Sequence, residues 1–191
     1  MKQFYISDTH FCHKNIVAFD GRPFITVEEM NEELIKRWNA VVENKDHVYI
    51  LGDFCWGKEP AWVELLKRLN GQKTLILGNH DITPQKSREY FADAKEYKVV
   101  DDNGRKVVLC HYPLPCFRNH YYGWYHLYGH VHTSYEWNMM EHMRYLQEEL
   151  YTTPCRMYNV GCMLPYMDYT PRTLDEIVAG YNRWKGKENE I

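Results

Sequence analysis

Short runs of apolar, β-branched and aromatic residues alternate along the chain with segments whose apolar residues recur at helical spacing. Such runs, when polar or turn residues follow them, are typical of buried strands. Two of the β-rich runs flank Asn103 and Gly104, which predicts a β-hairpin over 95–112. Because strands alternate with helices, the pattern favours a layered α/β fold. Further strands are expected at 4–7, 47–53, 73–81, 126–132 and 156–162.

The predicted helices carry recognisable start signals. Thr26 with Glu29, and Thr173 with Glu176, each have the spacing of a capping box. Pro60 stands near the start of another helical segment, where its missing N–H costs nothing. We expect helices at 26–42, 58–71, 83–94 and 173–185.

The length of 191 residues predicts one domain over 1–191. The segment 134–152 is polar, rich in methionine and compatible with a helix, and we interpret it as an insertion near the functional site. The tail 186–191 is expected to be frayed.

Composition restricts the class of protein. Hydrophobic residues make up 45% of the chain and charged residues 26%, as in ordinary globular proteins. A net charge of −3 gives no sign of a general affinity for nucleic acid, although a local basic patch remains open. Without a signal-peptide-like or membrane-spanning apolar run, we expect a cytoplasmic protein that does not bind membranes. The six cysteines form no C-x-x-C pair, which argues against a zinc knuckle or a thioredoxin-like site.

The ten histidines invite a search for metal ligands, and several of them follow predicted strands. Ligands in α/β sheets bind beyond the carboxyl ends of the strands, so polar groups far apart in sequence are expected to meet there. The polar residues at these strand ends are Asp8, His10, Asp53, Asn79, His80, Asp81, His111, His130 and His132.

These residues form five motifs in a fixed order. They are Asp-x-His at 8–10, Gly-Asp at 52–53, Gly-Asn-His-Asp at 78–81, His at 111 and Gly-His-x-His at 129–132. The ordered set resembles the calcineurin-like metallophosphoesterase superfamily, in its small single-domain bacterial and phage branch. One such motif occurs often by chance, whereas five in order are specific. The resemblance covers roughly residues 1–180 and implies a four-layer α/β/β/α sandwich.

The resemblance also implies two metal ions that share one ligand, Asp53, and a bridging water or hydroxide. One ion would be held by Asp8, His10, Asp53 and His132. The other would be held by Asp53, Asn79, His111 and His130. This mixture of imidazole, carboxylate and amide oxygen suits divalent transition metals, with Mn²⁺ as the first choice and Fe, Zn²⁺, Co²⁺ or Ni²⁺ as alternatives.

Two such ions can clamp the oxygens of an in-line phosphoryl displacement. With two aspartates and a hydroxide, the centre keeps about one positive charge, which favours a phosphate ester. The resemblance places His80 beside the substrate as a general acid, and Asp81 is interpreted as orienting His80 or supporting the strand end. The resemblance therefore implies a dinuclear phosphoesterase, and we expect its substrate to be a small phosphate ester, preferably a diester, with nucleotide-derived esters among the candidates.

Other residues have less specific signals. His13 and Arg22 are candidates for binding substrate phosphate, against the alternatives of a loop cap and a surface charge. The aromatic loop 112–128 is either a packed surface lid or a wall on which a nucleobase stacks.

Four other functions are alternatives. A nuclease predicts a basic, aromatic rim, which the net charge of −3 does not favour. A non-catalytic scaffold on this fold would lose motif residues, and none is lost here. The H-x-H-x-D-H motif of a metallo-β-lactamase-type hydrolase is absent, and the Asp-Arg-Gly of protein phosphatases does not follow Asp53. The sequence leaves the oligomeric state open.

Overall fold

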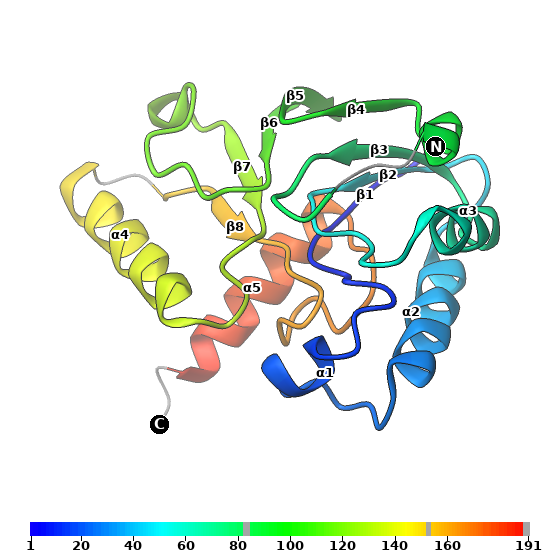
Figure 1. Cartoon of the computed structure of the whole chain (residues 1–191). Coiled ribbons are helices and arrows are strands. Elements are labelled where there is room, and N and C mark those ends of the chain that lie inside the picture. The colour runs from blue at the N-terminus through cyan, green and yellow to red at the C-terminus, as the bar shows by residue number, and fades with distance from the viewer. Residues whose placement is uncertain (82–84, 152–153, 189–191) are drawn as a thin grey trace.

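The computed structural model describes residues 1–81, 85–151 and 154–188, and it contains two four-stranded sheets flanked by helices (Figure 1). The first sheet has the order β1-β2-β3-β4, with bounds Gln3–Ile6, His47–Ile50, Gln72–Ile76 and Asp93–Lys95. The second has the order β5-β6-β7-β8, with bounds Tyr97–Asp102, Arg105–Cys110, Tyr125–Tyr128 and Met157–Asn159. The helices are α1 Ile16–Phe19, α2 Val27–Val41, α3 Glu59–Arg68, α4 Tyr135–Tyr151 and α5 Leu174–Glu188, with two 3₁₀ helices, η1 Gln85–Tyr90 and η2 His120–Tyr122.

All strands of the first sheet run parallel, so their carboxyl ends meet along one edge. Phe4 and Ile6 of β1 pack into a core with α2 and α3. Tyr5 points the other way and packs into a core shared with the second sheet. This alternation is the period of two expected for a strand buried on both faces.

The second sheet begins with the hairpin expected from the Asn-Gly signal. β5 and β6 are antiparallel, and Asn103 and Gly104 between them have φ angles of 53° and 82°, as a two-residue hairpin turn requires. β6, β7 and β8 then run parallel. An isolated bridge between Ser7 and Gly161 links the chain after β1 to the chain after β8.

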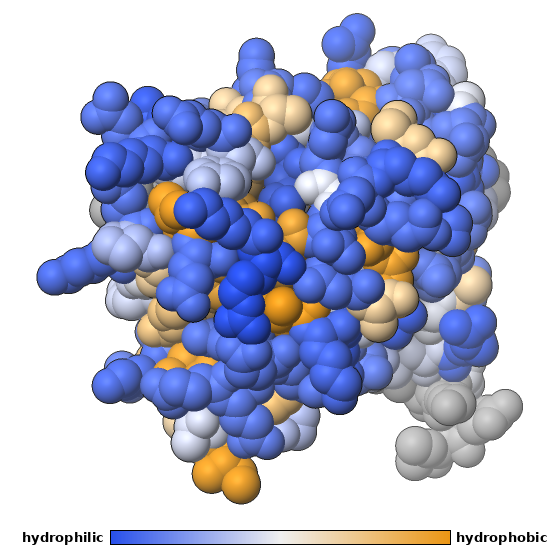
Figure 2. Space-filling view, turned by 90° about the vertical axis from the view of Figure 1, so that its right-hand side faces the viewer, coloured by the Kyte–Doolittle hydropathy of each residue, from blue (hydrophilic) through white to orange (hydrophobic). Residues whose placement is uncertain are grey.

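Amphipathic helices cover the sheets. In α2 the apolar residues Met30, Leu34 and Trp38 recur at helical spacing and are buried. Figure 2 shows that the side of the molecule at the right of Figure 1 is mostly hydrophilic, with separate apolar spots. Trp137 of α4 and Leu174 of α5 belong to the same core as the second sheet. The α/β fold class is confirmed, and no helix in the described ranges is long and apolar enough to cross a membrane.

Both predicted capping boxes mark helix starts. The hydroxyl of Thr26 accepts a hydrogen bond from the backbone N–H of Glu29 at 3.1 Å. At α5 the bonds are reciprocal. The Thr173 N–H donates to the Glu176 carboxylate at 2.8 Å, and the Glu176 N–H donates to the Thr173 hydroxyl at 3.4 Å.

The predicted helix at 83–94 is wrong in type. The chain forms the 3₁₀ helix η1 and then β4, whereas 83 and 84 lie outside the described residues. Asp93–Lys95 pairs in parallel with Thr74–Ile76, so pairing at the free edge of β3 overrides the local helical preference.

The predicted tail and the segment 134–152 are both at least partly helical. α5 continues through Glu188, so the tail is helical over 186–188, and 189–191 lie outside the described residues. The segment 134–152 forms α4 over Tyr135–Tyr151, and residue 152 is not among those described. Its interpretation as an insertion, and the single domain over 1–191, stay predictions.

Candidate metal centre

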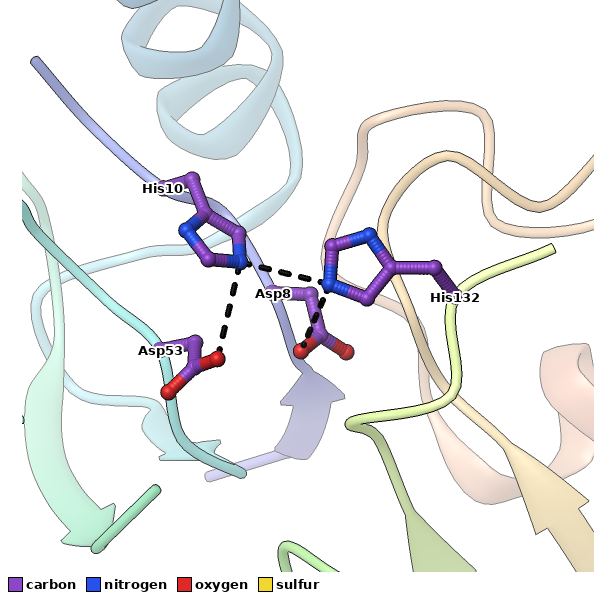
Figure 3. Close-up of side chains that lie close together, drawn as sticks. All are labelled: Asp8, His10, Asp53 and His132. Atoms are coloured by element: carbon purple, nitrogen blue, oxygen red, sulfur yellow. Dashed lines mark hydrogen bonds and ion pairs between the residues drawn. The ribbon is translucent and has the colours of Figure 1, made fainter. Parts of the chain in front are cut away.

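Side chains from three distant segments converge beyond the carboxyl ends of β1, β2 and β7 (Figure 3). Asp8 and His10 follow β1, Asp53 follows β2 and His132 follows β7. One nitrogen or carboxylate oxygen of each lies within 4.8 Å of those of the other three. These four residues are the first ligand set that the sequence predicts.

The potential ligand atoms of this first set face one another. Nε2 of His10 lies 3.6 Å from Oδ2 of Asp53 and 3.3 Å from Nε2 of His132. Nε2 of His132 lies 3.5 Å from Oδ1 of Asp8. Asp8, His10 and Asp53 are at most 4% exposed, so water screens their charges poorly.

The second predicted ligand set is also brought together. Oδ1 of Asn79 lies 3.1 Å from Nε2 of His111 and 3.0 Å from Nδ1 of His130. Nε2 of His111 lies 3.7 Å from Oδ2 of Asp53. The same Asp53 oxygen therefore stands between the two sets, at nearly equal distances from His10 and His111.

The hydrogen bonds of two histidines indicate that these atoms suit a cation. Nδ1 of His111 lies 2.7 Å from the Leu51 carbonyl, which only accepts, so the neutral ring carries its hydrogen there and Nε2 has a free lone pair. His132 has the same arrangement, because its Nδ1 lies 2.7 Å from the carboxylate of Asp20. Each Nε2 atom thus points its lone pair at a carboxylate oxygen. A cation between the nitrogen and the oxygen would remove the repulsion between their lone pairs.

The pKa shifts agree with such a centre. Burial, together with the nearby His132, lowers the pKa of His10 to about 2, so its ring stays neutral and able to bind a metal. Burial also lowers the pKa of His130. For His132 burial acts in the same direction, but the hydrogen bond to Asp20 and the charge of Asp8 raise its pKa overall. The surroundings of His132 therefore favour a positive charge.

The backbone is strained where the candidate ligands stand. Left-handed φ angles are uncommon for residues other than glycine, and they cluster at functional sites. Here they turn the chain sharply after the strands, so that neighbouring side chains aim at one point. The five candidate ligands with such angles are Asp8 (55°), His10 (48°), Asp53 (52°), His130 (70°) and His132 (45°).

Two glycines let the ligand loops approach one another. Gly52 has a φ of 87°, and a Cβ on it would collide with the ring of His111 and come within 2.8 Å of the Gly78 Cα. A Cβ on Gly78 would collide with the carboxylate of Asp53. Neither position accepts a side chain without moving a candidate ligand.

Asp81 holds two ligand loops together. Its carboxylate accepts backbone hydrogen bonds from Gly78 at 2.9 Å, Asp53 at 2.8 Å and Phe54 at 2.9 Å. Burial raises the pKa of Asp81 despite these three donors. Of its two predicted roles, these contacts favour support of the strand end.

His80 lies on the exposed side of the same loop. Its backbone N–H donates to Oδ1 of Asp53 at 3.0 Å, and its ring centroid lies 6.0 Å from that of His10. His80 is therefore next to both ligand sets, with its side chain exposed.

Arg22 lies behind the centre. Its side chain is fully buried and pairs with Asp20 at 2.8 Å. It also donates to the backbone carbonyls of Thr9 at 2.9 Å and Asp8 at 2.8 Å. Phosphate binding by Arg22 stays a prediction, and these contacts favour a role in positioning the ligand loop.

A hollow of about 500 Å³ opens over the candidate ligands. His13 and His80 line it, as do Phe19 of α1 and Trp56 of the loop before α3. None of the described lining residues comes from the aromatic loop 112–128, although the ring of Tyr112 lies 4.8 Å from that of His130.

Sequence reasoning missed Asp20, Phe19 and Trp56. Asp20 precedes Gly21 in an ordinary turn-like context, which carries no signal of a partner for a metal ligand. Phe19 ends a single helical turn that is too short to show a helical period. The Gly-Asp motif that ends at Asp53 was the available pointer to Trp56, since it places the next few residues beside the centre.

Both the fold and this constellation define a metallophosphoesterase-type protein, and comparison with known proteins agrees. The model of the calcineurin-like phosphoesterase superfamily domain matches residues 1–174. The chain belongs to this superfamily, whose members depend on metal.

Similar proteins occur in several kinds of organism. Uncharacterized protein MJ1445 of Methanocaldococcus jannaschii is 38% identical over 179 residues, which are 93% of this chain and 89% of that protein. Gene 66 protein of Mycobacterium phage L5 is 37% identical over 113 residues, which are 58% of this chain and 54% of the phage protein. The structure of AQ665 from Aquifex aeolicus, a protein of unknown function, matches with a TM-score of 0.69 and 26% identity over 93% of this chain and 97% of its own.

Proposed function

We propose that the protein is a metal-dependent phosphoesterase that hydrolyses a phosphodiester. The observation that carries this proposal is the position of Asp53. Its Oδ2 lies 3.6 Å from Nε2 of His10 in one ligand set and 3.7 Å from Nε2 of His111 in the other. A carboxylate shared in this way supports a pair of adjacent ions.

Divalent ions held here would supply positive charge for the phosphate oxygens and would make water a stronger nucleophile at neutral pH. The residues that would hold them are the two predicted sets, which share Asp53. The neutral Asn79 preserves part of the positive charge for the substrate. Asp20 fixes the ring of His132 and Leu51 that of His111 through their Nδ1 atoms, so Nε2 of each ring would be the ligand atom.

His80 would donate the proton that the leaving oxygen needs. Its backbone bond to Asp53 ties it to the centre, while its side chain remains exposed at the hollow. A general acid must lie within hydrogen-bond reach of the leaving oxygen, and the exposed ring of His80, which lines the hollow over the two ligand sets, is our candidate for that position.

The charge of the hollow supports a diester. Among its described lining residues there is no lysine or arginine, and the guanidinium of Arg22 is turned away and paired with Asp20. A phosphomonoester dianion needs more cationic partners than a diester monoanion. The surroundings therefore fit the diester better.

Metal removal and reconstitution test this function. Chelated protein should hydrolyse neither bis-p-nitrophenyl phosphate nor p-nitrophenyl phosphate. Addition of Mn²⁺ should restore hydrolysis, and nearly two ions should bind per chain when activity is complete. The restored kcat/KM should be higher for the diester than for the monoester. Full activity with one ion or none would contradict the dinuclear centre, and a strong preference for the monoester would contradict the substrate class.

A further inference from the structure

The hollow over the candidate ligands has an apolar wall beside its polar floor. Phe19 is 77% exposed and Trp56 is 49% exposed, although both line a hollow whose floor is formed by aspartate and histidine side chains. Large aromatic surface left open to water beside a polar centre is unfavourable unless a ligand covers it.

Trp56 is held in place before any ligand arrives. Its ring stacks on that of His13, with centroids 4.3 Å apart and planes 10° apart. Its backbone N–H donates to the carbonyl of Phe11 at 2.8 Å. A fixed aromatic ring loses little freedom on binding, so its remaining exposed surface is suited to stacking.

Trp56 also lies beside the proposed general acid. The ring centroids of Trp56 and His80 are 4.6 Å apart, at an angle of 54°. A leaving oxygen that receives a proton from His80 therefore brings the rest of its alcohol next to Trp56. Chemical specificity for the leaving group is thus expected from this wall.

We propose that Trp56 and Phe19 form a subsite for the base of a nucleoside leaving group, so that the substrate is a small nucleoside phosphodiester. This inference rests on the proposed function. In the reaction, water attacks phosphorus, the bond from phosphorus to the nucleoside oxygen breaks, and that oxygen takes a proton from His80. The attacking water gives up one proton, which replaces the proton lost by His80. The products are the free nucleoside and a phosphomonoester. A nucleic-acid strand fits less well, because its phosphates need cationic partners and the described lining offers no lysine or arginine.

A pair of substrates that differ only in the base tests the subsite. One is the methyl ester of adenosine 5′-monophosphate, and the other has the same sugar without the base. The Mn²⁺-loaded wild type should prefer the first by about 10–100-fold in kcat/KM, the usual effect of one stacked base. Adenosine and methyl phosphate should be the products.

Variants assign this preference to the wall. Trp56→Ala should bring the two kcat/KM values close together, Trp56→Phe should retain much of the preference, and Phe19→Ala should lower it. Tyr122→Ala is the matched control, because Tyr122 is 83% exposed but lies outside the hollow. Equal kcat/KM values in the wild type, or an unchanged preference in Trp56→Ala, would overturn the subsite.

Calorimetric binding of adenosine separates the two proposals. The wild type should bind adenosine at least about 10-fold more tightly than Trp56→Ala does. If neither diester is hydrolysed but this difference is seen, the proposed function is wrong and the subsite stands. If both diesters are hydrolysed alike and Trp56→Ala binds adenosine as the wild type does, the subsite is wrong and the function stands.

Discussion

Asp20 accepts a hydrogen bond from Nδ1 of His132, with 2.7 Å between the oxygen and the nitrogen. The other carboxylate oxygen of Asp20 pairs with Arg22, which in turn donates to the backbone carbonyl of Asp8. His132, from the last motif, is thereby linked to Asp8, from the first motif. The loop between β1 and α2 thus fixes the orientation of a ring that is supplied 112 residues later.

We expect Asp20→Asn to weaken binding of the first metal ion by about 10–100-fold, as loss of an outer partner of a ligating histidine usually does. The amide has no charge to hold the hydrogen on Nδ1 of His132. Competition with a chelator measures the Mn²⁺ affinity, and Glu43→Gln, an exposed carboxylate far from the centre, is the control. An unchanged affinity would show that His132 does not depend on Asp20.

Arg22→Met should lower the free energy of unfolding by about 3 kcal/mol, because it leaves the carboxylate of Asp20 without its buried partner. Urea denaturation in the presence of chelator measures this without the contribution of metal. A role for Arg22 in binding substrate phosphate makes a different prediction, namely a raised KM with unchanged stability. The exposed Arg118→Lys serves as the control.

The sequence allows the convergence of the ligand motifs to be predicted, for a physical reason. Asp8 and Asp53 each follow a predicted strand, and strands of one parallel sheet end at the same edge, so the order of motifs along the chain already implies a shared place. The left-handed backbone turns that orient the ligand side chains have a sequence signal only where a glycine precedes the ligand, as Gly52 precedes Asp53.

The parts that could not be predicted depend on contacts distant in sequence. Asp20 has an ordinary turn context, and its partner His132 cannot be inferred from local pattern. β4 is three residues of weak strand preference that exist as a strand only because β3 offers a free edge. The side chain of Trp56 faces the hollow because His13 stacks on it, which no spacing rule contains.

The shared position of Asp53 predicts a difference between two aspartate variants. Asp53→Asn should reduce the bound metal from two ions per chain to near zero and abolish hydrolysis, because Asp53 serves both ligand sets. Asp8→Asn should chiefly remove the ion of the first set. Elemental analysis at equal free Mn²⁺ makes the comparison. The same metal loss in both variants would argue against a bridging role for Asp53.

His126 should make stability depend on pH. Its Nδ1 donates to the carbonyl of Val108 and its Nε2 accepts from the backbone of Leu114, so the buried ring is neutral. Burial lowers its pKa from 6.5 to about 4. Between these values the unfolded chain binds a proton that the folded chain does not, so stability falls as the pH falls.

Comparison with His126→Phe isolates this effect. The wild type should exceed the variant in free energy of unfolding at pH 7, and the difference should shrink by about 1 kcal/mol per pH unit as the pH falls below 6.5. Denaturation in chelator at several pH values removes the contribution of bound metal from the comparison. If the difference in free energy of unfolding does not vary with pH, His126 is charged or exposed to water in the folded protein.

The role of His80 can be separated into proton transfer and electrostatic stabilisation by varying the leaving group. p-Nitrophenolate leaves without a proton, whereas an alkyl or sugar alkoxide needs one. If His80 is the general acid, His80→Ala should cost little kcat/KM on bis-p-nitrophenyl phosphate and about 10²–10⁴-fold on a diester with an alkoxide leaving group. If the ring instead stabilises the phosphoryl oxygens, both substrates should lose activity to the same degree. The geometry favours the first outcome, because the backbone N–H of His80 bonds to Asp53 while its ring lines the hollow beside Trp56. The measurement is kcat/KM across a series of leaving-group pKa values, with metal content determined in each sample. A uniform decrease along the series would reject the acid role and leave His80 as a phosphate-binding residue.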